Sequence, residues 1–233
     1  MLKILGASVS PFVRKVRVVL EEKGVPYELE PVFPFGNDPE FKKISPLGKI
    51  PAMRDGDKAI SDSSVISAYI ERKHPKPAMY PADDFDYARA LWFEEYADSA
   101  LVGVIGAKIF FARVVGPRFM NQKCDEAAVQ KAIDQELPPL FDYLESQLGS
   151  ADTLVGGAFS IADIAVASQF VNLAYAGVTV DAKRWPKLAP SIYAADNFVQ
   201  AAYVRAAKRG ITSFAKSRIE RSASSCEIVL KLT

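Results

Sequence analysis

Histidine is almost absent from this chain of 233 residues, because His74 is the only one. It lies beside Pro75, in a proline-rich stretch that is typical of an exposed connection. Ser-His-Asp triads and most histidine-based acid–base schemes need this side chain in a shaped site. The sequence therefore excludes those chemistries and predicts no catalytic or metal-binding role for His74.

Cysteine is also scarce. Cys124 and Cys226 are far apart in the sequence, and neither belongs to a Cys-x-x-Cys pair. This spacing argues against a disulfide framework and against a cysteine zinc site, so we expect no bound metal. Such cysteine usage fits a reducing cytoplasm.

An excess of either charge is missing too, since 29 basic and 28 acidic residues give a formal net charge of +1. This balance does not indicate nucleic acid or an anionic membrane surface as a partner. The first residues resemble a strand rather than a signal peptide, and we expect no apolar run of membrane-spanning length. A content of 49% hydrophobic and 24% charged residues predicts a soluble globular protein with a sizeable core.

The most informative stretch covers residues 2–24. A short apolar run leads into small residues and Ser10, and apolar residues then follow at helical spacing. Ser10 occupies the N-cap position, Pro11 the first helical position, and Gly24 the stop. Taken alone, Ser10 is a helix cap. A capping serine can still donate its own hydrogen to an anion held at the positive end of the helix.

The pattern after Gly24 predicts further strands and helices up to residue 73. Residues 27–32 alternate as a strand does, residues 33–39 form a loop, and the Asp55-Gly56 turn joins two short strands. The expected order is β-α-β-α-β-β-α. The proline-rich stretch that follows reads as a linker between domains.

From residue 85 onward the pattern is helical. Helices are expected at about 87–115, 125–148 and 191–208, with Gly116-Pro117 interrupting the chain after the first of them. Ser160 and Asp163 form a capping box, with Phe159 and Ile164 as its hydrophobic staple. The serine-rich tail from residue 217 receives no assignment.

Together these motifs resemble those of the cytosolic glutathione S-transferases, in a serine-type branch similar to the tau and bacterial members. The matching stretches are Ser10-Pro11-Phe12, Gly48-Lys49-Ile50-Pro51, Asp62-Ser63 and Phe159-Ser160-Ile161-Ala162-Asp163. The resemblance implies an N-terminal thioredoxin-like βαβαββα domain followed by an all-helical domain. We expect a glutathione-binding domain at 1–75, a linker at 76–85, a helical domain at 86–216 and an unassigned tail at 217–233.

The resemblance also implies glutathione as co-substrate. Ser10 would face its thiol, with Ser8 as the alternative. The Ile50 backbone, before a cis Pro51, would pair with the cysteinyl backbone of the tripeptide. Lys49 would neutralise the glycine carboxylate, and Asp62 with Ser63 would hold the γ-glutamyl end at a helix start.

The energetics of the thiol explain why a hydroxyl donor is expected. A free thiol has a pKa near 8.5, so ionising it at neutral pH needs a shift of about two units, or about 2.7 kcal/mol. A helix N-terminus contributes about 0.3–1 kcal/mol and a hydrogen bond to a charged group about 1.5–3 kcal/mol. Both are needed together. Arg14, Lys15 or Arg17 could assist, although we expect most of them on a solvated face.

The expected reaction is conjugation of the glutathione thiolate to a hydrophobic electrophile, by aromatic substitution or Michael addition. Candidate walls of an electrophile pocket between the domains are Phe12, Phe35, Phe110, Phe111 and Val114, each of which also fits core packing. Isomerisation, ether cleavage or peroxide reduction remain alternatives, as does a non-catalytic ligand-binding or regulatory role. The lack of cysteine near Ser10 disfavours mixed-disulfide chemistry and dehydroascorbate reduction. The family resemblance implies a homodimer, with Tyr69, Ala90 or Phe93 at its interface.

Overall fold

The computed structural model describes residues 1–33, 38–149, 153–208, 211, 217–221 and 228–232, the last two segments as backbone only. The first part holds four strands, β1 (Leu2–Leu5), β2 (Tyr27–Glu30), β3 (Ala52–Asp55) and β4 (Lys58–Ser61). They form one sheet in the order β2-β1-β3-β4, in which only the β1–β2 pair is parallel.

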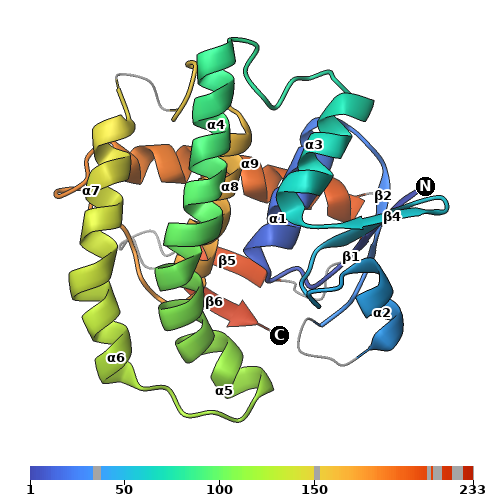
Figure 1. Ribbon diagram of the computed structural model, residues 1–233. Helices are drawn as coiled ribbons and strands as arrows, with labels where there is room; N and C mark the ends of the chain where they lie inside the picture. Colours follow the sequence, from blue (N-terminus) through green and yellow to red (C-terminus); the bar gives the residue numbers. More distant parts are fainter. Residues whose placement is uncertain (34–37, 150–152, 209–210, 212–216, 222–227, 233) are drawn as a thin grey trace.

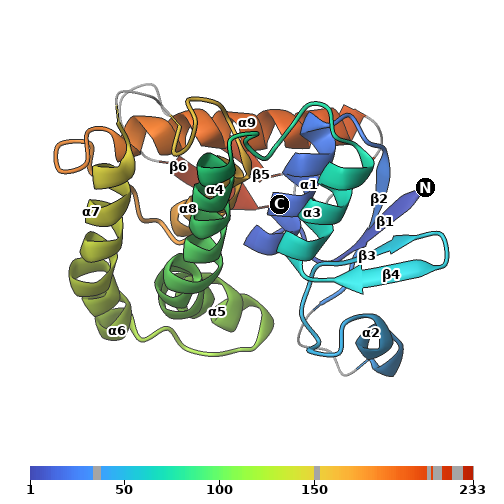
Figure 2. The same ribbon diagram turned by 45° about the horizontal axis from the view of Figure 1, so that its top comes forward.

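Helices cover both faces of this sheet. α1 (Pro11–Glu22) and α3 (Ser63–Lys73) lie on one face, and the short α2 (Pro39–Ile44) lies on the other, as Figure 2 shows. The resulting β1-α1-β2-α2-β3-β4-α3 order is the predicted thioredoxin-like arrangement. The predicted Asp55-Gly56 hairpin is confirmed, and Gly56 has the positive φ of 60° that such a turn requires.

The rest of the described chain up to residue 208 is helical (Figure 1). It contains α4 (Asp84–Tyr96), the π-helical η1 (Ala97–Val115), α5 (Gly116–Phe119), α6 (Glu126–Lys131), the π-helical η2 (Ala132–Glu136), α7 (Leu137–Gln147), α8 (Ile161–Tyr175) and α9 (Leu188–Lys208). α8 lies at the centre and packs against α1, α4, η1 and α9. This confirms the predicted all-helical domain.

Two sequence expectations about the long first helix are wrong. Gly116-Pro117 does not interrupt it, because Pro117 sits in the first turn of α5, where the backbone needs no N–H. The continuous run Asp84–Phe119 also contains an 18-residue window with a mean hydropathy of 1.7, which is long and apolar enough to span a membrane. Within the fold, its residues Leu101, Ile105 and Ile109 are fully buried, and η1 packs against α8.

Two of the expected dimer-interface positions are likewise wrong. Ala90 and Phe93 are 0% exposed within the single chain, so they belong to its core. Tyr69 is half-buried and donates its hydroxyl hydrogen to Asp55 at 2.5 Å.

The tail that the sequence left unassigned contains two antiparallel strands, β5 (Ser217–Arg221) and β6 (Ile228–Leu232).

The capping box before α8 is confirmed. The Asp163 carboxylate accepts the backbone N–H groups of Leu154 and Ser160, both at 2.9 Å, and the Ser160 hydroxyl at 3.1 Å. Burial raises the pKa of Asp163 above its ordinary value of 3.8, and the hydrogen bonds offset part of that effect. Phe159 stacks on Phe198 of α9, with ring centroids 4.1 Å apart. This box therefore fixes where the central helix begins.

We expect Asp163→Ala to lower the free energy of unfolding by about 2–4 kcal/mol, because two buried backbone N–H groups lose their acceptor. Denaturant unfolding followed by circular dichroism measures this change. Glu95→Ala, at an exposed position of α4, is the control and should leave the unfolding midpoint nearly unchanged. Equal midpoints for the two variants would show that the box does not stabilise the fold.

Candidate active site

The candidate residues gather beyond one edge of the sheet. In the strand register, Leu5 pairs with Ala52, and Ala52 pairs with Ser61. Three segments therefore lie at the same end of adjacent strands. They are the turn after β1, the Ile50-Pro51 peptide before β3, and Asp62 after β4. Strands lie about 4.8 Å apart, so this row spans about 10 Å, the length of an extended tripeptide.

Gly6 keeps the first two of these segments close together. A Cβ atom at Gly6 would lie 2.5 Å from a Val13 methyl group and 3.4 Å from the Ile50 Cβ. The first turn of α1 and the Ile50-Pro51 loop thus approach one another at a position where only glycine fits. The Asp62 N–H donates to the Pro51 carbonyl at 3.3 Å, which brings the third segment into the same group.

Ser10 is the N-cap of α1, as predicted. Its Oγ accepts from the Val13 N–H at a long 3.4 Å, and its own N–H donates to the Ala7 carbonyl at 3.0 Å. Among the described residues, none accepts a hydrogen bond from the Ser10 hydroxyl. Its hydrogen is thus available to a ligand at the positive end of the helix.

Ser8 has a different environment. Its Oγ accepts from the Arg17 guanidinium at 3.1 Å, and its carbonyl accepts from the Tyr203 hydroxyl at 3.3 Å. Arg17 is 2% exposed, so the Ser8 side chain is directed at the packed interior.

The loop before β3 carries Lys49, Ile50 and Pro51. The Ile50–Pro51 peptide bond is cis, as the resemblance implies. The Ser45 hydroxyl donates to the Lys49 carbonyl at 2.7 Å, while Gly48 N–H donates to the Ser45 carbonyl at 2.8 Å. Ser45, to which the sequence assigned no function, therefore holds this loop. The Lys49 side chain is exposed.

Asp62 and Ser63 form the start of α3. Asp62 has a φ of 87°, which is uncommon for a residue with a side chain. Its Oδ1 accepts the N–H groups of Ser64 at 2.9 Å and Val65 at 3.2 Å. Ser63 is buried as the first residue of the helix. An acidic group and a helix N-terminus therefore lie side by side, which suits a ligand end carrying both an ammonium and a carboxylate.

The three basic residues of α1 are buried rather than solvated, so that expectation is wrong. Arg14 and Lys15 are each 1% exposed and Arg17 is 2% exposed. The reason is that α1 is enclosed, since it contacts α3, α8 and α9 besides the sheet. The polar face of α1 packs against other helices, whereas the sequence pattern predicted that it would be exposed to solvent.

Lys15 joins α1 to three other elements. Its Nζ donates to the Ser64 hydroxyl at 3.0 Å, to Glu94 at 2.8 Å and to Asp98 at 2.5 Å. Glu94 is 3% exposed, so this is a buried ion pair. The contact fixes the start of α3, and hence Ser63, against the helical domain.

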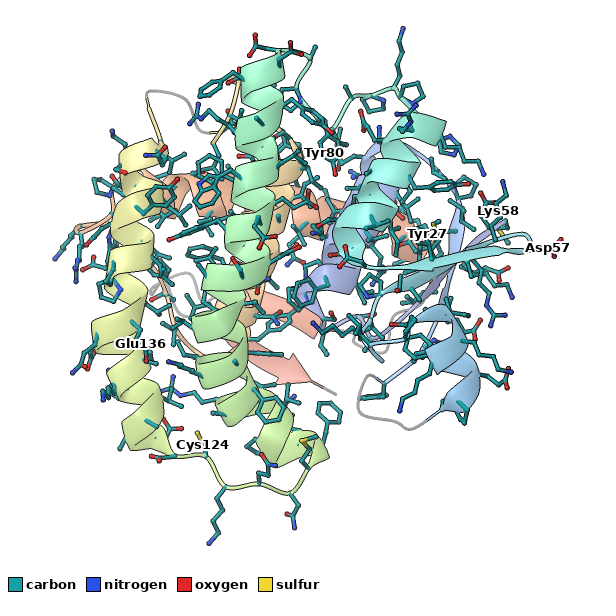
Figure 3. The ribbon with its side chains drawn as sticks, viewed as in Figure 1. Tyr27, Asp57, Lys58, Tyr80, Cys124 and Glu136 are labelled. Carbon is teal, nitrogen blue, oxygen red and sulfur yellow. The ribbon has the colours of Figure 1, made fainter. Side chains whose placement is uncertain are left out.

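The two arginines have partners on other elements. Arg14 Nη1 donates to the Ser168 carbonyl and to the Asn172 side chain of α8, both at 2.8 Å. Its Nη2 is buried and has no hydrogen-bond partner among the described residues. Arg17 Nε donates to the Tyr27 hydroxyl at 2.9 Å, and burial raises the pKa of Tyr27 to about 12. Tyr27, which Figure 3 labels, is the first residue of β2.

Comparison with known proteins decides the family. The pattern described as "Glutathione S-transferase, N-terminal domain" matches residues 5–78, and "Glutathione S-transferase, C-terminal domain" matches residues 126–192. A glutathione S-transferase of Triticum aestivum is 31% identical over 189 residues, which cover 79% of this chain and 84% of that one. The chain belongs to the glutathione S-transferase family.

One further relative and one solved structure are also similar to this chain. "Uncharacterized GST-like protein YibF" of Escherichia coli (strain K12) is 29% identical over 205 residues, 85% of this chain and 97% of that one. The fold is similar to glutathione transferase URE2P8 from Phanerochaete chrysosporium, solved with oxidized glutathione. That likeness has a TM-score of 0.73 at 23% identity and covers 91% of this chain and 97% of that one.

The residues predicted to line an electrophile pocket of this transferase have mixed environments. Phe12, Phe111 and Val114 are half-buried, whereas Phe110 is buried with its ring 6.4 Å from that of Tyr175. Phe35 lies outside the described residues. α8 packs against α1, which carries Phe12, and against η1, which carries the other three.

Sequence reasoning missed Tyr175, Tyr203 and the Phe33–Phe119 pair. Tyr175 ends α8 and lies between Arg14 and Phe110, its ring centroid 5.4 Å from the Arg14 guanidinium. Phe33 and Phe119 are both exposed, with ring centroids 5.4 Å apart. No local motif marks these residues, because the partners of each lie far away in the sequence.

Among the described residues, no group of three or more His, Cys, Asp or Glu side chains could hold a metal ion. Cys124 is a free thiol just before α6 and lies at the lower end of the molecule in Figure 3.

We expect Lys15→Met to lower the free energy of unfolding of this transferase by about 3–5 kcal/mol, because Glu94 would stay buried without its cation. Chemical denaturation measures the loss. Lys108→Met is the matched control, since it breaks the more exposed pair with Glu136, which is labelled in Figure 3, and should cost at most about 1 kcal/mol. Similar small losses for both variants would contradict the role given to Lys15.

Proposed function

We propose that this chain catalyses the attack of the glutathione thiolate on hydrophobic electrophiles, with Ser10 as the donor that stabilises the thiolate. The observation that carries the proposal is the capping hydroxyl of Ser10. It lies at the N-terminus of α1 and at the same sheet edge as Ile50-Pro51 and Asp62-Ser63. The three segments match the thiol, backbone and γ-glutamyl parts of one extended tripeptide.

Ser10 is preferred over Ser8 because the two hydroxyls have different neighbours. The Ser8 oxygen accepts from a buried arginine, so that side chain has a structural partner inside the protein. The Ser10 oxygen accepts only the long bond from Val13 among the described residues, and its hydrogen is free to be donated. A serine that both caps the helix and donates outward matches the energetic need of the thiol.

Arg14 adds a second source of positive potential. It follows Ser10 by one helical turn, and helical side chains lean back toward the N-terminus, so its guanidinium would lie on the Ser10 side of its own Cα atom. No ion pair joins it to a carboxylate among the described residues, and its contacts are to a carbonyl, an amide and a ring. An uncompensated buried cation favours an anion nearby, such as a thiolate.

The remaining contacts of glutathione follow from its two charged ends. The Ile50 backbone would pair with the cysteinyl backbone, as one strand pairs with another. The exposed Lys49 is free to reach the glycine carboxylate. Oδ2 of Asp62, which accepts no hydrogen bond from the described residues, would take the ammonium, while the start of α3 at Ser63 would receive the γ-glutamyl carboxylate.

The electrophile would lie where α1, η1 and the end of α8 approach each other. Phe12, Phe111, Val114 and Tyr175 are half-buried there and offer an apolar lining with one hydroxyl.

Identifying products from a panel of electrophiles would separate conjugation from isomerisation, ether cleavage and peroxide reduction. We place the enzyme in the cytoplasm, where reduced glutathione is available.

We expect Ser10→Ala to lower kcat/KM for conjugation at pH 6.5 by about a hundredfold, because a charge-assisted hydrogen bond worth about 2–3 kcal/mol is lost. The deficit should shrink as the pH approaches the pKa of the free thiol, near 8.5. Ser99→Ala is the control, since that exposed hydroxyl bonds only its own helix. Full activity of Ser10→Ala at pH 6.5 would remove Ser10 from the mechanism.

We also propose that the protein is a homodimer. Val65, Leu91 and Trp92 are exposed apolar residues of α3 and α4, and they are the candidates for contact with the partner. Leu91→Arg combined with Val65→Arg should then convert the dimer to a monomer in sedimentation experiments, whereas Val204→Arg on α9 should leave it dimeric. A monomeric wild-type protein at micromolar concentration would count against this assembly.

A further inference from the structure

The last long helix reaches back to the turn that carries the candidate serines. α9 runs across the helical domain and ends beside α1, as Figure 2 shows. From it, the Tyr203 hydroxyl donates to the backbone carbonyl of Ser8 at 3.3 Å. Residues 195 positions apart in the sequence are thus joined two residues before Ser10.

Arg17 completes this contact from the other side. Its Nη1 donates to the Ser8 hydroxyl at 3.1 Å, and its guanidinium carbon lies 4.2 Å from the centroid of the Tyr203 ring. A cation stacked on a ring at this distance attracts it by electrostatics as well as by packing. Ser8 is therefore held through its side chain by α1 and through its backbone by α9.

The turn between Ser8 and Ser10 is short and transmits this restraint. The Ser10 N–H donates to the Ala7 carbonyl, so Ala7 to Ser10 form one closed turn. A shift of the Ser8 carbonyl must displace the Ser10 hydroxyl, because the two residues lie within that turn.

We propose that Tyr203 is a positioning residue for the thiolate chemistry, acting through Ser8 on the Ser10 hydroxyl. This inference rests on the proposed function. The hydroxyl must lie at hydrogen-bonding distance from the sulfur, and a displacement of about 1 Å is enough to reduce the rate severely. The helical domain thereby sets the geometry of a donor that belongs to the thioredoxin-like domain.

The test is Tyr203→Phe, which keeps the ring on Arg17 and removes only the hydroxyl. The ultraviolet absorbance of the bound glutathione thiolate is titrated against pH, and kcat and KM are measured at pH 6.5. We expect the thiol pKa to rise by about half to one unit and kcat to fall about three- to tenfold. The KM for glutathione should change less than about twofold, because the residues proposed to hold its two ends are untouched.

Arg205→Gln is the matched control. Arg205 lies two residues further along α9 and pairs with Glu22 of α1, so its loss loosens the same helix without touching Ser8. This variant should lower the unfolding midpoint and leave the thiol pKa unchanged. Equal shifts of the thiol pKa in Arg205→Gln and Tyr203→Phe would show general loosening and overturn the inference.

Failure of this inference differs from failure of the proposed function. If the wild-type thiol pKa is lowered and Ser10→Ala raises it, the proposed function stands. An unchanged pKa in Tyr203→Phe would then overturn only the role of Tyr203. A wild-type thiol pKa that stays near 8.5 when bound would overturn both.

Discussion

Burial of three cations on α1 is the constraint on which the arrangement of this protein depends. A buried charge is tolerated only with partners, and each cation finds its own on a different element. Lys15 pairs with Glu94 and Asp98 and reaches the start of α3, Arg14 bonds the central helix α8, and Arg17 joins β2, the serine turn and α9. α1 therefore has one orientation in which all three make these contacts, and that orientation sets the two domains against each other.

The same constraint places the chemistry. The N-terminus of α1 carries Ser10, so whatever fixes α1 also fixes the hydroxyl that we propose as the thiol donor. The sheet register contributes the remaining geometry, because Leu5, Ala52 and Ser61 lie in one row and the binding segments leave from that row. The two early serines have different partners, since the Ser8 hydroxyl accepts from the buried Arg17 and the Ser10 hydroxyl caps α1. In the proposed mechanism the thiol needs about two units of pKa shift, and no single contribution reaches that reliably, so the helix end, the hydroxyl and the Arg14 charge would act together.

Local signals allowed much of the fold to be predicted. The Ser10-Pro11 helix start, the Asp55-Gly56 hairpin and the Ser160–Asp163 capping box are each specified within a few residues, and all three are present. Contacts between distant segments were not predictable. The charged side of α1 has the pattern of a solvated face, and only the docking of α8 and α9 shows that it is enclosed. For the same reason Tyr203 and Tyr175 carried no signal, and Ala90 and Phe93 were assigned to an interface although they lie in the core. Pro117 failed as a helix stop because its effect depends on whether a new first turn begins there.

A crystal structure of the wild-type protein with glutathione bound would test the central claim most directly. The account predicts the sulfur within hydrogen-bonding distance of the Ser10 Oγ, with the peptide running past Ile50 toward Asp62 and Ser63. A sulfur atom out of reach of the Ser10 hydroxyl would contradict it.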